Sequence, residues 1–245
     1  MKILREFGQY IKMFNGMFRM PENKSMYWKQ FMLQCNDIGV GSLGIVGIIS
    51  FFIGAVSTVQ TAYQLVSPII PKTTIAQIVR DTVILEFAPT LTCIVLAGVV
   101  GSKIASELGN MRVSEQIDAL EIMGINTKAY LILPKILAGV LTIPLLIVLA
   151  MALGILGGRL AGSAAGIIDP SIYDNGLLMD FNGYNVFFAL TKSFVFAFIS
   201  TSVPAFYGYH VKGGALEIGH ASTRAVVVSC VLLLLADYVL SALLL

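Results

Sequence analysis

Long stretches without charged residues alternate with shorter polar segments along this chain of 245 residues. Several of these stretches reach the roughly 20 helical residues that cross the hydrocarbon core of a bilayer. Residues 159–183, which contain Pro170 and several Asp, Asn and Gly residues, are expected to form a loop with short helical pieces. The pattern defines one membrane domain over residues 39–245. It predicts five transmembrane helices, at 39–66, 82–102, 130–158, 184–209 and 222–245.

Residues 1–38 follow a different, amphipathic pattern. Helical spacing gathers apolar side chains on one face of residues 2–20 and leaves Lys, Arg, Asn and Gln on the other. The apolar face consists of Ile3, Leu4, Phe7, Tyr10, Ile11, Phe14, Met17 and Phe18. Pro21 interrupts the pattern, and Trp28 follows in a second apolar cluster. A basic amphipathic helix of this kind lies in the membrane interface; a soluble helix packed on another subunit is the alternative.

Composition narrows the class of protein. Hydrophobic residues make up 57% of the chain and charged residues 12%, with a mean hydropathy of +0.85. This leaves too little polar surface for a soluble globule of the same length. The net charge of +2 gives no reason to expect nucleic-acid binding, and the scattered Cys35, Cys93 and Cys230 indicate no disulfide framework. The predicted fold class is an all-α integral membrane protein.

Basic residues are distributed unequally between the two sides of the predicted helices. Twelve Lys and Arg residues lie in the N-terminal segment, in 103–135 and in 210–224, against three on the opposite side. Because cytoplasmic loops carry an excess of Lys and Arg, the N-terminus and the 103–135 segment are expected in the cytoplasm. Five crossings then place the C-terminus outside.

The first predicted span carries a ridge of small residues, Ser50, Gly54 and Thr58. Small side chains at this spacing let two helices approach closely in a membrane, where helix packing depends on van der Waals contact. The ridge can face a helix of another subunit or a helix of the same chain, and the sequence favours neither.

The segment 102–134 is a polar island between two apolar stretches. Ser114 can cap a helix start, Glu115 and Asp118 fall in the first turn, and Gly124 can end the helix. A helix of about ten residues is about 15 Å long, too short to cross a bilayer. Acidic residues outnumber the single Arg112 between residues 107 and 126, so a protein partner is favoured over anionic lipid.

No catalytic or nucleotide-binding motif occurs in the sequence. It lacks the G-x-x-x-x-G-K-[ST] loop that cradles phosphates and the G-x-S-x-G elbow of hydrolases. The two histidines, His210 and His220, have no carboxylate pair nearby and are expected to be loop residues, not metal ligands. The sequence therefore predicts a protein that is not itself an enzyme and has no catalytic residue, metal or cofactor. Any ATP must be handled by a partner.

Four short motifs occupy the polar island: A-S-E-L-G at 105–109, M-R-V at 111–113, E-Q-I-D-A-L at 115–120 and M-G-I-N at 123–126. Together they resemble the signature loop of the MlaE/YrbE-type permeases, the membrane subunits of ABC lipid transporters. Weaker similarity continues over 131–135 and 207–227, so the resemblance covers most of the chain after Thr82.

The resemblance implies a role for the polar island. A helix over 107–124 would be the coupling helix, which docks on a separate cytoplasmic ABC ATPase subunit; an ordinary surface helix is the alternative. The resemblance further implies a homodimer in the bacterial inner membrane that moves phospholipid to or from a periplasmic MCE-domain protein. The residues assigned to ATPase coupling are Glu107, Gly109, Arg112, Glu115, Gln116, Asp118, Ala119 and Glu121.

Three charged residues, Glu86, Lys192 and Asp237, interrupt the predicted spans. A charge at the bilayer centre costs about 2.5–3.5 kcal/mol on insertion scales, so each should face protein or water and find a partner. They form either a polar element beside a lipid path or a charge network that only fixes helix packing. The family often has a basic residue directly before the glutamate, whereas Leu85 stands there in this chain.

Two other classes of function stay open at this point. An ion-coupled secondary transporter would use Glu86 and Asp237 for coupling, and a membrane scaffold would transport nothing. Co-purification with an ATPase would distinguish the ABC permease hypothesis from the ion-coupled transporter and from the scaffold.

Overall fold

The computed structural model describes residues 2–17, 24–65 and 71–244, with side chains from Arg5 and Ser25 onward in the first two ranges. The described residues are helical almost throughout and include no strand. Five described helices are long and apolar enough to cross a membrane. They are Ser25–Gln64, Thr73–Val113, Lys128–Ala164, Gly183–Tyr209 and Ala215–Leu244. The predicted fold class, an all-α integral membrane protein with five transmembrane helices, is confirmed.

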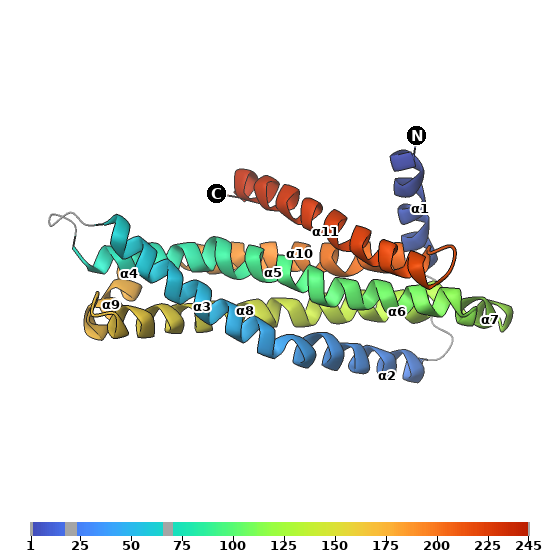
Figure 1. Cartoon of the computed structure of the whole chain (residues 1–245), viewed down its shortest axis with the longest axis horizontal. Helices are drawn as coiled ribbons and strands as arrows, with labels where there is room; N and C mark the ends of the chain where they lie inside the picture. The colour runs from blue at the N-terminus through green and yellow to red at the C-terminus, as the bar shows by residue number, and fades with distance from the viewer. Residues whose placement is uncertain (1, 18–23, 66–70, 245) are drawn as a thin grey trace. The chain divides into compact units, whose positions relative to one another are not determined.

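Most of the long helices are built from several joined segments (Figure 1). The first joins α2 (Lys24–Cys35), the π-helical turn η1 (Asn36–Val40) and α3 (Gly41–Gln64). The second joins α4 (Thr73–Thr82), η2 (Val83–Leu91), α5 (Thr92–Leu96), η3 (Ala97–Gly101) and α6 (Ser102–Val113). The third joins η4 (Lys128–Ile132) and α8 (Leu133–Ala164). The other two are α10 (Gly183–Tyr209) and α11 (Ala215–Leu244).

Among the described residues, three shorter helices lie outside these spans: α1 (Lys2–Met17), α7 (Gln116–Ile122) and α9 (Pro170–Leu178). The expected N-terminal helix is therefore present as α1, while Phe18, Arg19, Pro21 and Pro68 lie outside the described residues. The expected loop at 159–183 contains a short helix, α9, as predicted, but it begins later than expected because α8 continues to Ala164. The polar island is also divided differently from the expectation, since α6 continues the second span as far as Val113.

The chain divides into two compact units. Unit 1 comprises Met1–Ser42, Ile94–Thr142 and Ala197–Ala236. Unit 2 comprises Leu43–Cys93, Ile143–Phe196 and Asp237–Leu245.

In unit 2, the small-residue ridge of α3 packs against α8. A methyl group on Gly54 would overlap the carbonyl group of Gly154, and one on Gly157 would overlap the backbone of Phe51. Thr58 packs beside Gly158 and donates its hydroxyl hydrogen to the Gly54 carbonyl at 3.1 Å. The ridge is thus an internal seam of this chain, which answers the question that the sequence left open.

A buried arginine fixes α9 in unit 2. The Arg80 guanidinium lies at the end of α4, where it donates to the carbonyl groups of Leu177 and Met179, both at 2.8 Å. It also forms an ion pair with Asp81 at 2.9 Å. These bonds satisfy carbonyls at the C-terminal end of α9 that have no partner within the helix.

In unit 1, aromatic side chains attach α1 to α10. The Tyr10 ring lies edge-on to Phe206 with centroids 5.6 Å apart, and Phe14 contacts Phe198 at 5.5 Å. Phe7 and Ile11 stay exposed on α1. The apolar face of α1 is therefore divided between protein contact and an open surface.

Candidate functional site

Lys192 of α10 is fully buried in unit 2 and contacts two acidic side chains. Its ammonium group lies 3.0 Å from a carboxylate oxygen of Glu86 and forms a second ion pair with Asp237. The three charged residues predicted to interrupt the spans thus form one cluster. The sequence did not indicate which of the two acids pairs with Lys192. In the structure both carboxylates contact its ammonium group.

A backbone carbonyl in the same element as Glu86 also accepts from the ammonium group. Lys192 donates to the carbonyl of Leu85 at 3.1 Å. Pro89 and Glu86 both lie in η2, whose wider π-helical turns are common at functional sites.

The two acids of the cluster differ in exposure. The Glu86 side chain is 43% exposed and that of Asp237 is 18% exposed, whereas Lys192 is at 0%. The Thr90 hydroxyl lies 3.3 Å from both carboxylates and can donate to either. Glu86 is therefore the member of the cluster that reaches the open surface of unit 2, and Lys192 is the member enclosed by protein.

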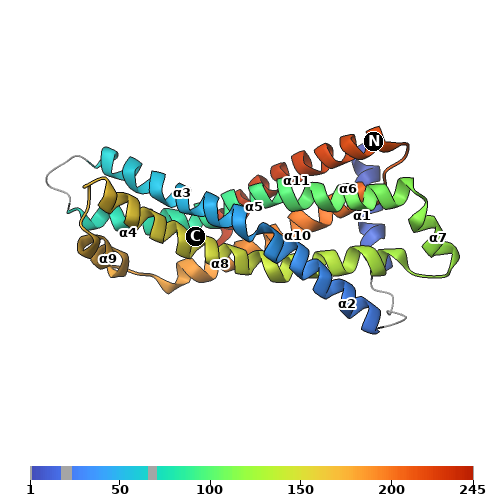
Figure 2. The same cartoon turned by 60° about the horizontal axis from the view of Figure 1, so that its bottom comes forward.

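In unit 1, α7 begins differently from the prediction. Ser114 ends α6, and its hydroxyl donates back to the Asn110 carbonyl at 2.7 Å, so the prediction that Ser114 caps the start of the helix is wrong. Glu115 precedes α7 with a left-handed backbone, φ +58°, and turns the chain away from the axis of α6 (Figure 2). The prediction that Gly124 ends the helix is confirmed: its φ is +82°, which glycine adopts readily.

Several side chains hold the inner face of α7 in place. Ile117 is fully buried, and Arg112 forms a 2.6 Å ion pair with Asp118. One carboxylate oxygen of Glu121 accepts hydrogen bonds from the hydroxyls of Tyr209 at 2.9 Å and Thr127 at 3.1 Å. Because these contacts involve α6, α10 and the segment before η4, α7 is anchored to its unit at both ends.

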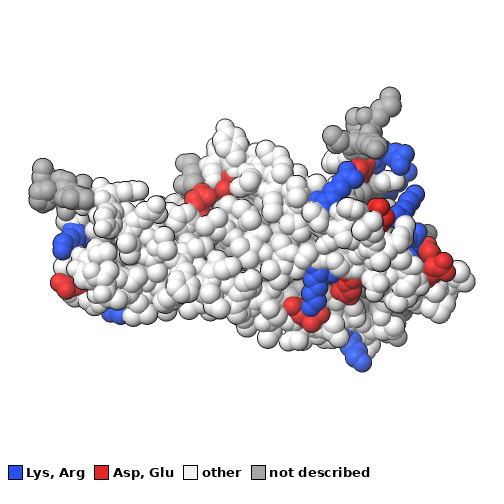
Figure 3. Space-filling view, in the orientation of Figure 1, with Lys and Arg blue, Asp and Glu red and all other residues white. Residues whose placement is uncertain are grey.

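The outer face of α7 is open and partly apolar. Glu115, Gln116 and Ala119 are exposed, and Ile122 and Met123 follow with exposures of 87% and 66%. Figure 3 shows Lys, Arg, Asp and Glu side chains gathered at the α6–α7 end of unit 1. An exposed apolar tip beside acidic side chains fits a protein-docking surface better than a solvated one.

Five of the eight residues assigned to coupling lie away from this outer face. Glu107 accepts a 2.6 Å hydrogen bond from Lys135, whose side chain is buried. Gly109 is buried, and a methyl group there would press on Val211 and Ile218. Arg112, Asp118 and Glu121 hold the inner side of α7, which leaves Glu115, Gln116 and Ala119 on the open side.

Sequence reasoning missed the partners that fix these residues. Lys135 stands at the start of an apolar stretch, which was a signal that it needed a carboxylate, but nothing local identified Glu107. Tyr209 ends α10 far along the chain from Glu121, and no sequence pattern connects them. Ile122 and Met123 were not singled out from the sequence, and the structure leaves both exposed.

The described helices and sites define a class: an all-helical, multi-pass membrane protein with a short, exposed helix outside its spans. Residues 31–243 match the family model described as Permease MlaE, and the chain belongs to this family of permeases. The resemblance of the four island motifs to this family is thereby confirmed.

Three relatives illustrate the breadth of the similarity. A probable ABC transporter permease protein of Rickettsia bellii is 34% identical over 218 residues, covering 89% of this chain and 84% of that protein. The intermembrane phospholipid transport system permease protein MlaE of Haemophilus influenzae is 32% identical over 213 residues, covering 85% and 80%. The chloroplastic protein TRIGALACTOSYLDIACYLGLYCEROL 1 of Arabidopsis thaliana is 31% identical over 217 residues, covering 89% and 62%.

Proposed function

We propose that this permease is the membrane subunit of an ABC transporter that moves phospholipid between the bacterial inner membrane and a periplasmic MCE-domain partner. Two copies of the chain form the permease, and ATP is hydrolysed on a separate cytoplasmic ATPase subunit. The observation that carries the proposal is the family match over residues 31–243. The similarity to a relative named for intermembrane phospholipid transport supports it.

The ATPase docks on the outer face of α7. Ile122 and Met123 supply an apolar anchor, and Glu115 supplies a charge at its rim. An apolar centre with a polar rim is the usual composition of a protein interface. The anchoring of α7 by Asp118 and Glu121 supports this role, because a helix held at both ends can transmit a displacement to α6 and α10.

The Lys192 cluster lies beside the lipid path. Glu86 is the exposed member and faces the path, while Lys192 and Asp237 hold it there. With the N-terminus in the cytoplasm, as the excess of Lys and Arg favours, the cluster lies in the outer half of the membrane and α1 lies in the inner interface.

A reconstituted transport assay tests this function. The chain is placed in proteoliposomes with the ATPase and MCE-domain protein that co-purify with it from its native membrane, and transfer of fluorescent phospholipid is followed. We expect transfer that requires ATP and stops when the ATPase is omitted. Transfer driven by an ion gradient without ATP would instead support the secondary-transporter alternative, and no transfer under either condition would support the scaffold.

The docking surface is tested with changes confined to exposed side chains. Glu115→Lys combined with Ile122→Glu should release the ATPase or uncouple its hydrolysis from transport, while the permease still assembles in the membrane. The matched control is Glu217→Lys with Leu216→Glu, which alters an exposed acid and an exposed apolar residue at the start of α11. Equal effects of both variants on ATPase binding would argue against docking on α7.

A further inference from the structure

A basic cavity of about 250 Å³ lies in unit 1, behind α7. Its walls come from the end of α6, from α7, from the start of η4 and from the loop after α10. Three cationic side chains line the cavity, Arg112, Lys128 and Lys212, against one carboxylate, Glu121.

The positive charge of this cavity is only partly neutralised. Arg112 forms its ion pair with Asp118, and Glu121 already accepts two hydroxyl hydrogen bonds. Among the described side chains, no carboxylate lies within ion-pair distance of Lys128 or Lys212. Two ammonium groups at the cavity wall are therefore available to an anion from outside the chain.

His210 lines the same cavity as the three basic side chains. Burial lowers the pKa of its imidazole below the ordinary value, and the nearby Lys128, Arg112 and Lys212 lower it further. Its Nδ1 lies 2.9 Å from the Phe206 carbonyl and donates to it in the neutral ring. The Nε2 atom then remains as a hydrogen-bond acceptor for a headgroup hydroxyl.

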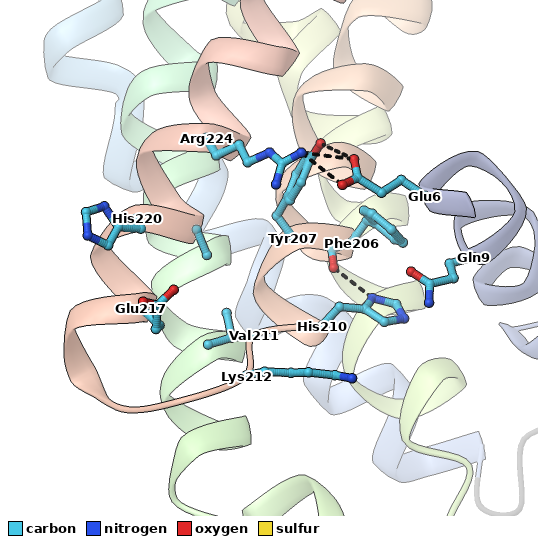
Figure 4. A pocket seen from close by; sticks show the side chains of 11 residues that line it. Glu6, Gln9, Phe206, Tyr207, His210, Val211, Lys212, Glu217, His220 and Arg224 are labelled. Carbon is cyan, nitrogen blue, oxygen red and sulfur yellow. Dashed lines mark hydrogen bonds and ion pairs between the residues drawn. The ribbon is translucent and has the colours of Figure 1, made fainter. Parts of the chain in front are cut away.

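The cavity borders α1, the helix expected in the membrane interface. The Lys128 side chain crosses Gly16 of α1 so closely that a methyl group at Gly16 would collide with it, and Asn126 donates to the Gly16 carbonyl at 2.8 Å. A neighbouring cavity of about 320 Å³ shares His210 and Lys212 and is also lined by Gln9 of α1. Figure 4 shows Lys212 extending alongside His210 toward α1.

We propose that Lys128 and Lys212 bind the phosphate of an anionic lipid headgroup in the leaflet where α1 lies. Basic pockets between transmembrane helices at the cytoplasmic side are suited to such headgroups, and charge-assisted hydrogen bonds to phosphate are strong. The bound lipid would secure the junction of α1 and α7 without entering the lipid path. The site is separate from the Lys192 cluster and does not require the chain to transport lipid.

Counting retained lipids by native mass spectrometry tests the site. The permease is released from nanodiscs of phosphatidylcholine containing a minor fraction of phosphatidylglycerol, and the bound lipids are identified. The wild type should retain phosphatidylglycerol selectively, and Lys128→Gln with Lys212→Gln should lower this retention by about tenfold. Lys128→Arg with Lys212→Arg keeps both charges and should retain the lipid.

The matched control removes two exposed charges elsewhere, Lys12→Gln with Lys29→Gln. Equal loss in both double variants would mean general attraction to an anionic surface and would overturn the site. If the Lys128 and Lys212 variant does not assemble, Lys212→Gln alone continues the test, because Lys212 lies on an exposed loop.

Titration with inorganic phosphate and with ATP distinguishes the source of the anion. If the site takes a lipid headgroup, millimolar amounts of either should leave the retained phosphatidylglycerol unchanged. Displacement of the lipid by inorganic phosphate at micromolar concentration would make the cavity a site for soluble phosphate and would overturn the lipid assignment. Unchanged lipid retention with loss of ATPase association would assign both lysines to the protein interface instead.

Discussion

Lys192 occupies the most demanding position for a charged side chain among the described residues of this chain. It is enclosed by protein within a predicted span, and the described groups that bind its ammonium group lie far away in the sequence. Removing one partner of a buried ion pair leaves the other charge without compensation, which costs about 3–5 kcal/mol. The different exposures of the two acidic side chains then predict how much stability each single substitution should cost.

We expect Lys192→Met to lower the thermal stability of the purified permease most, Asp237→Asn less and Glu86→Gln least. Lys192→Met combined with Asp237→Asn should recover part of the loss, because one uncompensated charge is removed with its partner. Unfolding in detergent measures this order. Equal stability in all variants would contradict the pairing, whereas normal stability with lost transport in the single variants would assign the charges to the lipid path.

His210 gives unit 1 a defined response to pH. Because the folded pKa lies below the ordinary value of about 6.5, the unfolded chain binds the proton first as the pH falls. Neutral His210 therefore stabilises the folded state at pH values above about 6.5. This contribution to the free energy of unfolding is lost as the pH falls from about 6.5 to the lower pKa of the folded protein. His210→Gln should flatten the fall in melting temperature between neutral and mildly acidic pH. The matched control is His220→Gln, and equal flattening in both variants would contradict the assignment to His210.

At the scale of elements, α3 and α8 pack with almost no side chain between them in unit 2. The contact depends on Gly54, since any larger residue meets the backbone of Gly154. Gly54→Ala should destabilise the permease by about 1–3 kcal/mol through overpacking. Gly44→Ala, on the same helix with open space around the added methyl, should be neutral or slightly stabilising. Unfolding curves of the two variants measure this difference in stability. Equal effects of both substitutions would contradict a close crossing of α3 and α8.

The elements could be predicted where one physical requirement dominates. Apolar stretches of about 20 residues identified all five spans, because a bilayer imposes that length. The ends could not be read in the same way, since α6 and α11 continue as ordinary helices beyond their apolar parts. Ser114 illustrates the difficulty: serine suits a helix start, but its hydroxyl serves equally well to bond back to a carbonyl at a helix end.

The candidate sites were predictable only in part, for a similar reason. Glu86, Lys192 and Asp237 stand out because charge is rare in an apolar span, and this alone was enough to expect a cluster. The carbonyl of Leu85 and the hydroxyl of Thr90 carry no such signal. The basic cavity behind α7 was also hidden, because Lys128 and Lys212 lie far apart in the sequence and the polar island is acidic when counted by itself.

For the whole molecule, five crossings predict that the two ends of the chain lie on opposite sides of the membrane. In a variant without its native cysteines, Leu243→Cys should react with a membrane-impermeant maleimide in intact spheroplasts. Asn110→Cys, exposed at the α6 end of unit 1, should react only after the membrane is opened. Labelling of both positions in intact spheroplasts would refute the proposed orientation.

The Lys192 cluster also has a consequence for how the protein is made. Among the five candidate spans, the one formed by α10 has the least apolar window, and it carries the buried lysine. Segments leave the ribosome from the N-terminus onward, so Glu86 is already in the membrane when Lys192 emerges, and Asp237 follows with the last span. Lys192 can therefore form its ion pair with Glu86 as soon as α10 enters the membrane. The α10 helix, which would partition poorly into lipid by itself, can pack against the earlier span that carries Glu86. The order of the charged residues along the chain therefore helps α10 to insert into the membrane.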